Sequence, residues 1–255
     1  MKTFVIGDIH GNIDALKQCL ERSSFNYTED KLIVLGDICD GFQPAIKESV
    51  DELLKIKNLI FVIGNHDRFF IDYIDTNNVI NGWYHQGGYM TLKSYGLKQQ
   101  YLHNRSWYDE FSEEQYNVET GEVIIPQAHL DFFKRGVYYY IDDKNRLFVH
   151  GGAKFNTPVE EQEPNYLTWD RDLYKQARDI DTNNKVMCRN EKIPLYNEIF
   201  IGHTTTSTWS KVPVNYANLW MLDQGAGWRG KLTIMNVDTK EYWQSEYYDF
   251  EIIQV

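Results

Sequence analysis

Three short, uninterrupted apolar runs near the start of the chain constrain its fold more than any other feature. They span residues 4–6, 32–35 and 59–63, and a glycine follows each of them directly. Runs of this kind are typical of strands that are buried on both faces of a mostly parallel sheet. After the first run, Asn12 stands at a helix N-cap position and apolar residues then recur at helical spacing. After the second run, Pro44 suits the first position of another helix. The pattern predicts a β-α-β-α-β unit.

The rest of the chain shows weaker periodicity and then a series of strand patterns. Residues 72–121 are rich in Asn, Gly, Tyr and Trp, and we expect a helix over 86–95 and otherwise loops. Residues 72–125 are therefore expected to form a loop-rich insert near the active site. A helix over 126–134 and a hairpin of strands 137–141 and 146–149 follow. Further strands are expected over 198–201, 218–222, 231–237 and 241–247. Without a repeat or a linker, residues 1–255 are expected to form a single domain.

The surplus of acidic residues limits what the chain can bind. It has 26 Lys and Arg against 37 Asp and Glu, a formal net charge of −11, which opposes attraction to a nucleic-acid duplex. No stretch approaches the roughly 18 apolar residues of a membrane span, and the first residues lack a signal-peptide pattern, so we expect a cytoplasmic protein without a membrane partner. The cysteines are odd in number and far apart, which favours reduced thiols. Cys19, Cys39 and Cys188 are expected to be small buried hydrophobic residues.

Polar residues that suit metal binding follow each of the three apolar runs. The segments are Gly-Asp-Ile-His-Gly at 7–11, Gly-Asp-Ile-Cys-Asp-Gly at 36–41 and Gly-Asn-His-Asp at 64–67. Because the carboxyl ends of neighbouring parallel strands converge on one crevice, we expect Asp8, Asp37 and Asn65 to lie side by side. Two later strands also end in a histidine beside a glycine, at His150 and His203. A single Asp, Asn or His after a strand commonly only caps a helix or closes a turn. Five strands that all end in such residues favour a shared site.

Buried carboxylates and imidazoles in one crevice require a positively charged partner. Without one, each would cost on the order of several kcal/mol to bury. A mixed set of oxygen and nitrogen ligands suits Mn, Fe or Zn better than Ca or Mg, and Mn is the metal that we expect. Since Asp37 is central in the order of the motifs, it can bridge two divalent ions roughly 3.5–4 Å apart.

In this order and over nearly the whole chain, the motifs resemble those of the calcineurin-like metallophosphoesterases. The resemblance is closer to their phosphoprotein phosphatase branch, which includes the lambda-phage-type phosphatase and the bacterial diadenosine tetraphosphate hydrolases. It implies an α/β fold of four layers, in which two mixed β-sheets pack together with helices on the outside. It also implies two sets of metal ligands that share one residue. The first ion would be held by Asp8, His10 and Asp37, and the second by Asp37, Asn65, His150 and His203.

The same resemblance assigns a general acid. His66 is implied to protonate the leaving oxygen, with Asp40 orienting its ring. Histidine suits this role because its ordinary pKa lies near 6.5 and a carboxylate partner favours the imidazolium form. A hydroxide between the two ions would attack phosphorus directly, so no protein nucleophile is needed.

The chain departs from the family pattern where the substrate phosphate is usually held. The family has an arginine directly after the position of Asp40, whereas this chain has Gly41. Arg171 resembles the later arginine that bacterial and phage-type members use on phosphate, and it is the phosphate-binding residue that we expect. Arg68 is a second candidate, and Asn65 is expected to contact the phosphate as well.

These features predict a phosphomonoesterase, first of all a serine/threonine protein phosphatase whose partner is a phosphoprotein. The alternative is hydrolysis of a small phosphorylated substrate such as diadenosine tetraphosphate, whose anhydride leaving group needs less help from His66. A non-catalytic phosphate-binding module is disfavoured because every ligand position is filled. His85, His103 and His129 are expected to be surface or packing residues, and Asp67 to be a structural hydrogen-bonding residue.

Overall fold

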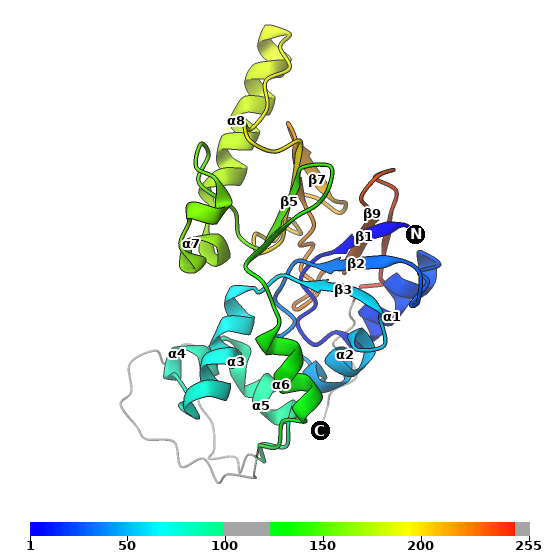
Figure 1. Cartoon of the computed structure of the whole chain (residues 1–255), viewed down its shortest axis with the longest axis vertical. Coiled ribbons are helices and arrows are strands. Elements are labelled where there is room, and N and C mark those ends of the chain that lie inside the picture. Colours follow the sequence, from blue (N-terminus) through cyan, green and yellow to red (C-terminus); the bar gives the residue numbers. More distant parts are fainter. Residues whose placement is uncertain (99–122, 248–255) are drawn as a thin grey trace.

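The computed structural model describes residues 1–98 and 123–247, which form two mixed β-sheets with helices around them (Figure 1). The strands are β1 (Thr3–Ile6), β2 (Lys31–Val34), β3 (Asn58–Phe61), β4 (Tyr139–Ile141), β5 (Arg146–Val149), β6 (Glu198–Ile201), β7 (Val214–Tyr216), β8 (Leu219–Met221), β9 (Thr233–Asn236) and β10 (Tyr242–Gln244). The helical segments are α1 (Ile13–Arg22), α2 (Ile46–Leu53), α3 (Asn65–Thr76), α4 (Asn81–Trp83), the π-helical turn η1 (Tyr84–Gly88), α5 (Tyr89–Ser94), α6 (Gln127–Lys134), the 3₁₀ turn η2 (Val159–Glu161), α7 (Pro164–Trp169) and α8 (Asp172–Met187).

The two sheets have similar strand arrangements. The first has the order β10-β9-β1-β2-β3, and the second has the order β4-β5-β6-β8-β7. Each sheet contains three adjacent parallel strands. These are β1, β2 and β3 in the first sheet and β5, β6 and β8 in the second. The other two strands of each sheet pair antiparallel with their neighbours. The predicted β-α-β-α-β unit is therefore confirmed as β1 to β3 with α1 and α2.

Alternating side chains along the strands divide the core into layers. In β1, Phe4 and Ile6 pack in a cluster with helix residues, whereas Val5 lies in a cluster shared by both sheets. In the second sheet, Phe148 and Phe200 stack in the same shared cluster with their ring centroids 4.9 Å apart. In Figure 1, α1 and α2 lie beside the first sheet and α7 and α8 beside the second. The four-layer arrangement implied by the motifs is confirmed.

Two helix starts show how the loops after the strands are shaped. α1 begins as predicted, because the Oδ1 atom of Asn12 accepts a hydrogen bond from the backbone N–H of Ala15 at 3.1 Å. α2 begins at Ile46 with Ala45 as its N-cap residue, so the prediction that Pro44 takes the first helical position is wrong. Just before the helix, the carbonyl group of Gln43 lies against Gly11.

The segment from residue 72 onward is more helical than expected. α3 continues to Thr76, and the predicted helix over 86–95 is instead the turn η1 followed by α5. The boundary moves because Gly87 has a φ of 110°, which interrupts regular helix there. Residues 99–122, which belong to the predicted insert and include His103, lie outside the described residues.

The second half of the chain confirms the predicted strands but contains helices that were not expected. The hairpin is β4 paired antiparallel with β5, and β6, β8, β9 and β10 fall within the predicted ranges. α7, α8 and the short strand β7 were not predicted. α8 has a short apolar stripe at helical spacing, Leu173, Tyr174, Ala177 and Ile180, which packs against the core of the second sheet. This stripe was missed in the sequence analysis.

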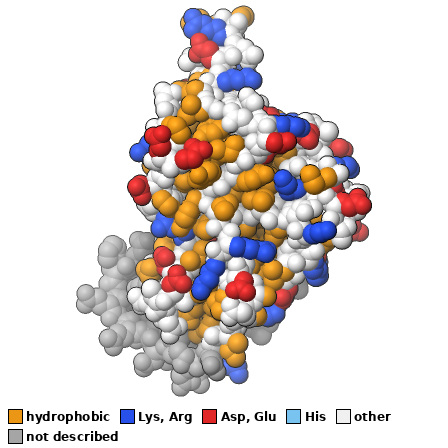
Figure 2. Space-filling model, viewed as in Figure 1, with side chains coloured by type: hydrophobic (Ala, Val, Ile, Leu, Met, Phe, Trp, Pro, Cys, Tyr) orange, Lys and Arg blue, Asp and Glu red, His pale blue; other side chains and the backbone are white. Residues whose placement is uncertain are grey.

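Cysteine and histidine positions partly correct the sequence analysis. Cys19 and Cys39 are buried as expected, but Cys188 is exposed, because it caps the end of α8 in a left-handed conformation instead of packing in a core. His129 is a buried packing residue that contacts Tyr95, as predicted. Figure 2 shows one face, on which acidic and basic side chains surround hydrophobic ones. Among the described helices, none combines the length and the apolar content of a membrane span.

Candidate dinuclear metal centre

The candidate site lies where parallel strands of both sheets end. Each strand leads into a loop that carries one or two of the side chains singled out by the motifs, and these loops meet between the two sheets. The residues are Asp8 and His10 after β1, Asp37 and Asp40 after β2, Asn65 and His66 at the start of α3, His150 after β5, and His203 after β6.

Two groups of buried side chains are close enough to hold a metal ion each. Asp8, His10 and Asp37 offer ligand atoms that all lie within 4.8 Å of one another, and so do Asp37, His150 and His203. Asp37 belongs to both groups, which is the position that a bridging carboxylate takes in a two-ion site. The sixth predicted ligand joins the second group, because Asn65 Oδ1 lies 3.0 Å from His150 Nε2.

The orientation of the histidines favours a cation in the middle of these groups. His10 donates its Nδ1–H to the carbonyl oxygen of Cys39 at 2.8 Å, and His150 donates its Nδ1–H to the carbonyl oxygen of Leu35 at 2.6 Å. In a neutral ring the Nε2 atom then carries a lone pair. At His150 this atom faces two further oxygen atoms, Asn65 Oδ1 at 3.0 Å and Asp37 Oδ2 at 3.2 Å. Burial would lower the pKa of His150, but the charge of Asp37 and their hydrogen bond outweigh it and raise this pKa, which favours a proton on Nε2 in the metal-free chain. A bound cation would take the place of this proton among the same three atoms.

Burial and mutual charge set the protonation of these side chains. Burial raises the pKa of Asp8 well above its ordinary value, and the charges of Asp223 and Asp37 raise it further. Burial lowers the pKa of His10 to about 4 and that of His203 to about 3. Both rings are therefore neutral at neutral pH, as a metal ligand must be.

At Asp37, the carboxylate shared by both ligand groups, neighbouring charges outweigh burial and lower the pKa. Burial alone would raise the pKa of Asp37, but the positive charges of His150 and His66 outweigh it and hold this pKa below its ordinary range. Asp37 is therefore ionised and presents a negative charge to both ligand groups.

Glycines allow the two carboxylates to lie directly against the backbone. A Cβ atom at Gly64 would overlap Asp37 Oδ1, and one at Gly202 would overlap Asp8 Oδ1. Any larger residue at either position would displace the carboxylate. The glycines that precede Asn65 and His203 are therefore explained by the close packing of a candidate ligand.

His66 and Asp40 form a second arrangement beside the metal ligands. His66 Nδ1 lies 2.6 Å from Asp40 Oδ2, and its ring centroid is 5.2 Å from that of His10. Burial would lower the pKa of His66, but the charge of Asp37 and the hydrogen bond to Asp40 outweigh it and raise this pKa to about 9. His66 is therefore positively charged at neutral pH and can donate a proton.

Two residues that the sequence did not indicate hold Asp40 in place. Trp83 donates its Nε1–H to the Asp40 carboxylate at 3.0 and 3.1 Å, and Thr91 donates its hydroxyl to Asp40 Oδ1 at 2.6 Å. These donors favour the ionised carboxylate and oppose the burial that raises its pKa. No sequence signal connects Trp83 and Thr91 with Asp40, because they come from the segment that was expected to consist mainly of loops.

The two candidate phosphate-binding arginines have different surroundings. Arg171 is exposed and donates its Nε–H to His203 Nε2 at 3.1 Å, so its guanidinium lies at the edge of the second ligand group. Arg68 instead donates to Asn165 Oδ1 at 3.1 Å and lies over the ring of Tyr138. The structure brings Arg171 to the candidate site and turns Arg68 toward α7.

Two more aspartates complete the surroundings. Asp67 accepts hydrogen bonds from the backbone N–H groups of Ile38, Cys39 and Gly64 at 2.9 to 3.1 Å, the structural role that was predicted. Asp223 is buried near Asp8 and was missed, although it follows strand β8 in the same way that other candidate ligands follow theirs. Burial raises its pKa to about 6.

Comparison with known proteins places this arrangement in a family. The model of the calcineurin-like phosphoesterases matches residues 1–211. The chain belongs to this family. Family membership makes it a hydrolase, and the candidate ligand groups agree with the two divalent metals that calcineurin-like phosphoesterases use.

Relatives within the calcineurin-like phosphoesterase family carry two different names. A symmetrical bis(5'-nucleosyl)-tetraphosphatase of Pseudomonas putida (strain GB-1) is 24% identical over 291 residues, which cover 98% of this chain and 94% of the relative. The serine/threonine-protein phosphatase 2 of Salmonella typhimurium is 24% identical over 238 residues, 92% of either chain. A crystal structure proposed to be a diadenosine tetraphosphatase has a TM-score of 0.64 at 15% identity and covers 97% of this chain and 94% of its own, which supports the fold.

Proposed function

We propose that this phosphoesterase hydrolyses phosphate monoesters with two manganese ions, and that its substrates are phosphoserine and phosphothreonine in proteins. Asp8, His10 and Asp37 would hold one ion, and Asp37, Asn65, His150 and His203 the other. Ions in these positions would supply an activated water molecule for attack on phosphorus and positive charge for the phosphate oxygens.

The protein residues would bind the phosphate group and supply a proton. Arg171 would contact the substrate phosphate, because its guanidinium is exposed at the edge of the site. A neutral His203 has one nitrogen lone pair, so it cannot accept from Arg171 and hold an ion at the same time. We infer that Arg171 would leave His203 in the metal-loaded protein, which would free its guanidinium for the phosphate. Arg68 is already engaged at α7 and would have no direct role.

The hydrogen bond between His66 and Asp40 is the observation that best supports a monoester substrate. The alcohol released from phosphoserine is a poor leaving group and needs a proton as the P–O bond breaks. His66 is charged, only partly buried, and held by Asp40 at 2.6 Å. Asp40 is in turn fixed by Trp83 and Thr91. A polyphosphate leaving group is stable as an anion and would gain little from such an arrangement.

Metal removal and reconstitution test the proposed cofactor. Treating the purified protein with a chelator should abolish hydrolysis of phenyl phosphate, and adding Mn should restore it. Asp37→Asn should not be restored by Mn, because Asp37 belongs to both ligand groups. Undiminished hydrolysis after complete removal of metal would contradict the proposal.

Substrate comparison tests the proposed specificity. We would measure kcat/KM for a phosphoserine peptide and for diadenosine tetraphosphate with Mn, in the wild-type protein and in His66→Asn. We expect the peptide to be the better substrate and to lose far more activity in the variant. The exposed His85→Asn is the control for loss of a histidine elsewhere. A large preference for diadenosine tetraphosphate would reverse the assignment.

One feature favours dinucleoside polyphosphates as a second candidate. Trp169 and Trp228 are 41% and 38% exposed and flank the ligand groups, with ring centroids 5.7 Å from His203 and 6.0 Å from His10. Exposed indoles at both ends of a phosphate-binding site can stack on the bases of such a substrate. Replacing both with leucine should impair hydrolysis of diadenosine tetraphosphate more than that of phenyl phosphate, if this second activity is the physiological one.

A further inference from the structure

Asp223 is a buried carboxylate beside the candidate metal centre that belongs to neither group of candidate ligands. It follows the end of β8 by two residues. Its backbone is fixed on two sides. A Cβ atom at Gly7 would lie 2.3 Å from the carbonyl oxygen of Leu222, and the N–H and hydroxyl of Thr206 donate to the carbonyl oxygen of Asp223 at 2.9 and 3.1 Å. Asp8 and Asp223 therefore follow two backbone segments that are in direct contact.

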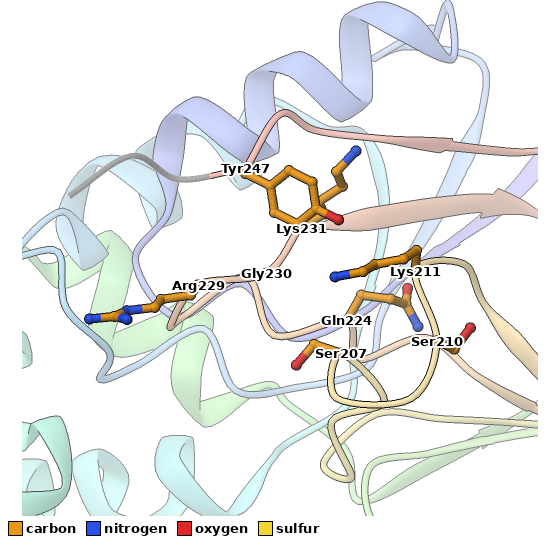
Figure 3. A pocket seen from close by; sticks show the side chains of 8 residues that line it. All are labelled: Ser207, Ser210, Lys211, Gln224, Arg229, Gly230, Lys231 and Tyr247. Carbon is orange, nitrogen blue, oxygen red and sulfur yellow. The ribbon is translucent and has the colours of Figure 1, made fainter. Parts of the chain in front are cut away.

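The side chain of Asp223 faces the two ligand groups. The next residue, Gln224, lines a pocket to which Asp223 does not contribute (Figure 3), and successive residues of an extended chain point to opposite sides. Burial raises the pKa of Asp223, and the charge of Asp37 raises it further while that of His150 lowers it. Burial and the charge of Asp223 in turn raise the pKa of Asp8. Such effects are strongest between groups that lie close together.

One carboxylate oxygen of Asp223 has no hydrogen bond within the part of the chain that the structure describes. Oδ1 accepts from the backbone N–H of Gly225 at 2.8 Å, whereas no described group donates to Oδ2. The residue is only 6% exposed. A buried carboxylate is costly unless a donor or a positive charge compensates it. Asp223 therefore needs a partner on the side of the ligand groups.

The first ligand group has fewer members than the second and leaves more positions for water. It consists of Asp8, His10 and Asp37, whereas Asn65 adds a fourth ligand to the second group. Manganese commonly takes an octahedral set of ligands, so water molecules would complete the first ion. Asp223 lies outside the distance that joins the members of this group. It would therefore reach the first ion through one of these water molecules.

We propose that Asp223 helps to hold the first ion, because its Oδ2 accepts a hydrogen bond from a water molecule that this ion carries. The inference rests on the two-ion centre of the proposed function. Residues that contact metal ligands in this way commonly change metal affinity about 10–100-fold when they are replaced. Asp223 would thus set how tightly the ion among Asp8, His10 and Asp37 is bound.

Manganese titration of the metal-free protein at pH 8 tests the proposal, with free Mn measured by electron paramagnetic resonance. We expect the wild type to bind two ions. In Asp223→Asn, the amide oxygen can still accept from Gly225, but the amide nitrogen cannot accept from water. One of the two ions should therefore bind about 10–100-fold more weakly, and the other should bind as before.

Asp30→Asn is the matched control. Asp30 is also 6% exposed, but it precedes β2, whereas Asp37 follows it. Its carboxylate accepts from the backbone N–H groups of Lys2 and Asn26 at 2.7 and 3.1 Å. This variant should bind both ions as the wild type does. Anomalous diffraction from Asp223→Asn at limiting Mn should show the loss at the first ligand group only.

Thermal unfolding without metal separates this role from a structural one. Replacing Asp223 by a neutral amide removes a negative charge that lies buried near Asp37. Metal-free Asp223→Asn should therefore melt at a higher temperature than the metal-free wild type and gain less from added Mn. A residue that only stabilised its loop would show the opposite change.

Four results would overturn the proposal. They are unchanged affinity for both ions in Asp223→Asn, an equal loss in Asp30→Asn, loss of the ion at the second group instead of the first, and a metal-free variant that melts no higher than the wild type. These measurements need no turnover. A chain that binds both ions as expected but hydrolyses no phosphoserine peptide would refute the proposed substrate alone, whereas a wild type that binds no Mn would refute both proposals.

Discussion

Replacement of His66 by asparagine should slow the release of a poor leaving group far more than that of a good one. Asparagine can still donate to Asp40, so the buried carboxylate is not left without a partner. The proton donor itself is lost. General acid catalysis contributes about 10²–10⁴-fold, which corresponds to about 3–5 kcal/mol of transition-state stabilisation.

The pH dependence gives a second measure of the same residue. Without ions, the pKa of His66 is raised to about 9, since the Asp37 charge and the bond to Asp40 outweigh burial. Ions bound at Asp37 offset its contribution but leave the Asp40 bond in place. The imidazolium form exists below the pKa, so activity on a poor leaving group should fall as pH rises, between the ordinary value of about 6.5 and about 9.

Steady-state kinetics with phosphoserine peptide and with 4-nitrophenyl phosphate would measure both effects. We expect kcat for the peptide to fall by at least about 100-fold in His66→Asn, with a much smaller fall for the activated ester. The alkaline limb of the peptide profile should disappear. Equal losses on both substrates, or an unchanged alkaline limb in the variant, would refute the assignment of His66 as the proton donor.

Three further outcomes follow from the geometry. Gly202→Ala should displace the Asp8 carboxylate, lower the manganese content measured by elemental analysis and destabilise the fold by about 1–3 kcal/mol, whereas Gly82→Ala, with no atom within 4 Å of the added Cβ, should do neither. Burial raises the pKa of Asp223 to about 6, so the folded chain binds the proton more tightly than the unfolded chain. The unfolding free energy of the metal-free protein should therefore fall by up to about 3 kcal/mol as pH rises from about 4 to 6, and Asp223→Asn should flatten this slope in chemical denaturation. Trp83→Phe removes one hydrogen-bond donor to Asp40, the carboxylate that orients His66. It should lower the pH at which activity on the phosphoserine peptide falls. An unchanged pH profile would mean that the Trp83 indole only packs.

The sequence predicted the strands and the meeting of their loops because both depend on short-range patterns. Uninterrupted apolar runs mark strands buried on both faces, and parallel strands bring their carboxyl ends together whatever lies between them. Asp223 obeys the same rule after β8 and could have been found in this way. Its strand was predicted, and Asp223 stands two residues after the end of that strand.

Other features could not be predicted, because they depend on contacts between distant segments. Trp83 donates to Asp40 across 43 positions, and no periodicity relates the two. α8 is a different case, because Leu173, Ala177 and Ile180 recur at helical spacing and could have indicated its first half. Pro44 satisfies the local rule for a helix start, but the helix begins at Ile46, after the chain has packed against Gly11 at Gln43.

Anomalous diffraction at the manganese edge, from crystals grown with Mn, tests the central claim most directly. We expect two peaks per chain about 3.5–4 Å apart, one among Asp8, His10 and Asp37 and one among Asp37, His150 and His203, with the Asp37 carboxylate between them. Density for a single ion, or none within these groups, would contradict a two-ion phosphoesterase.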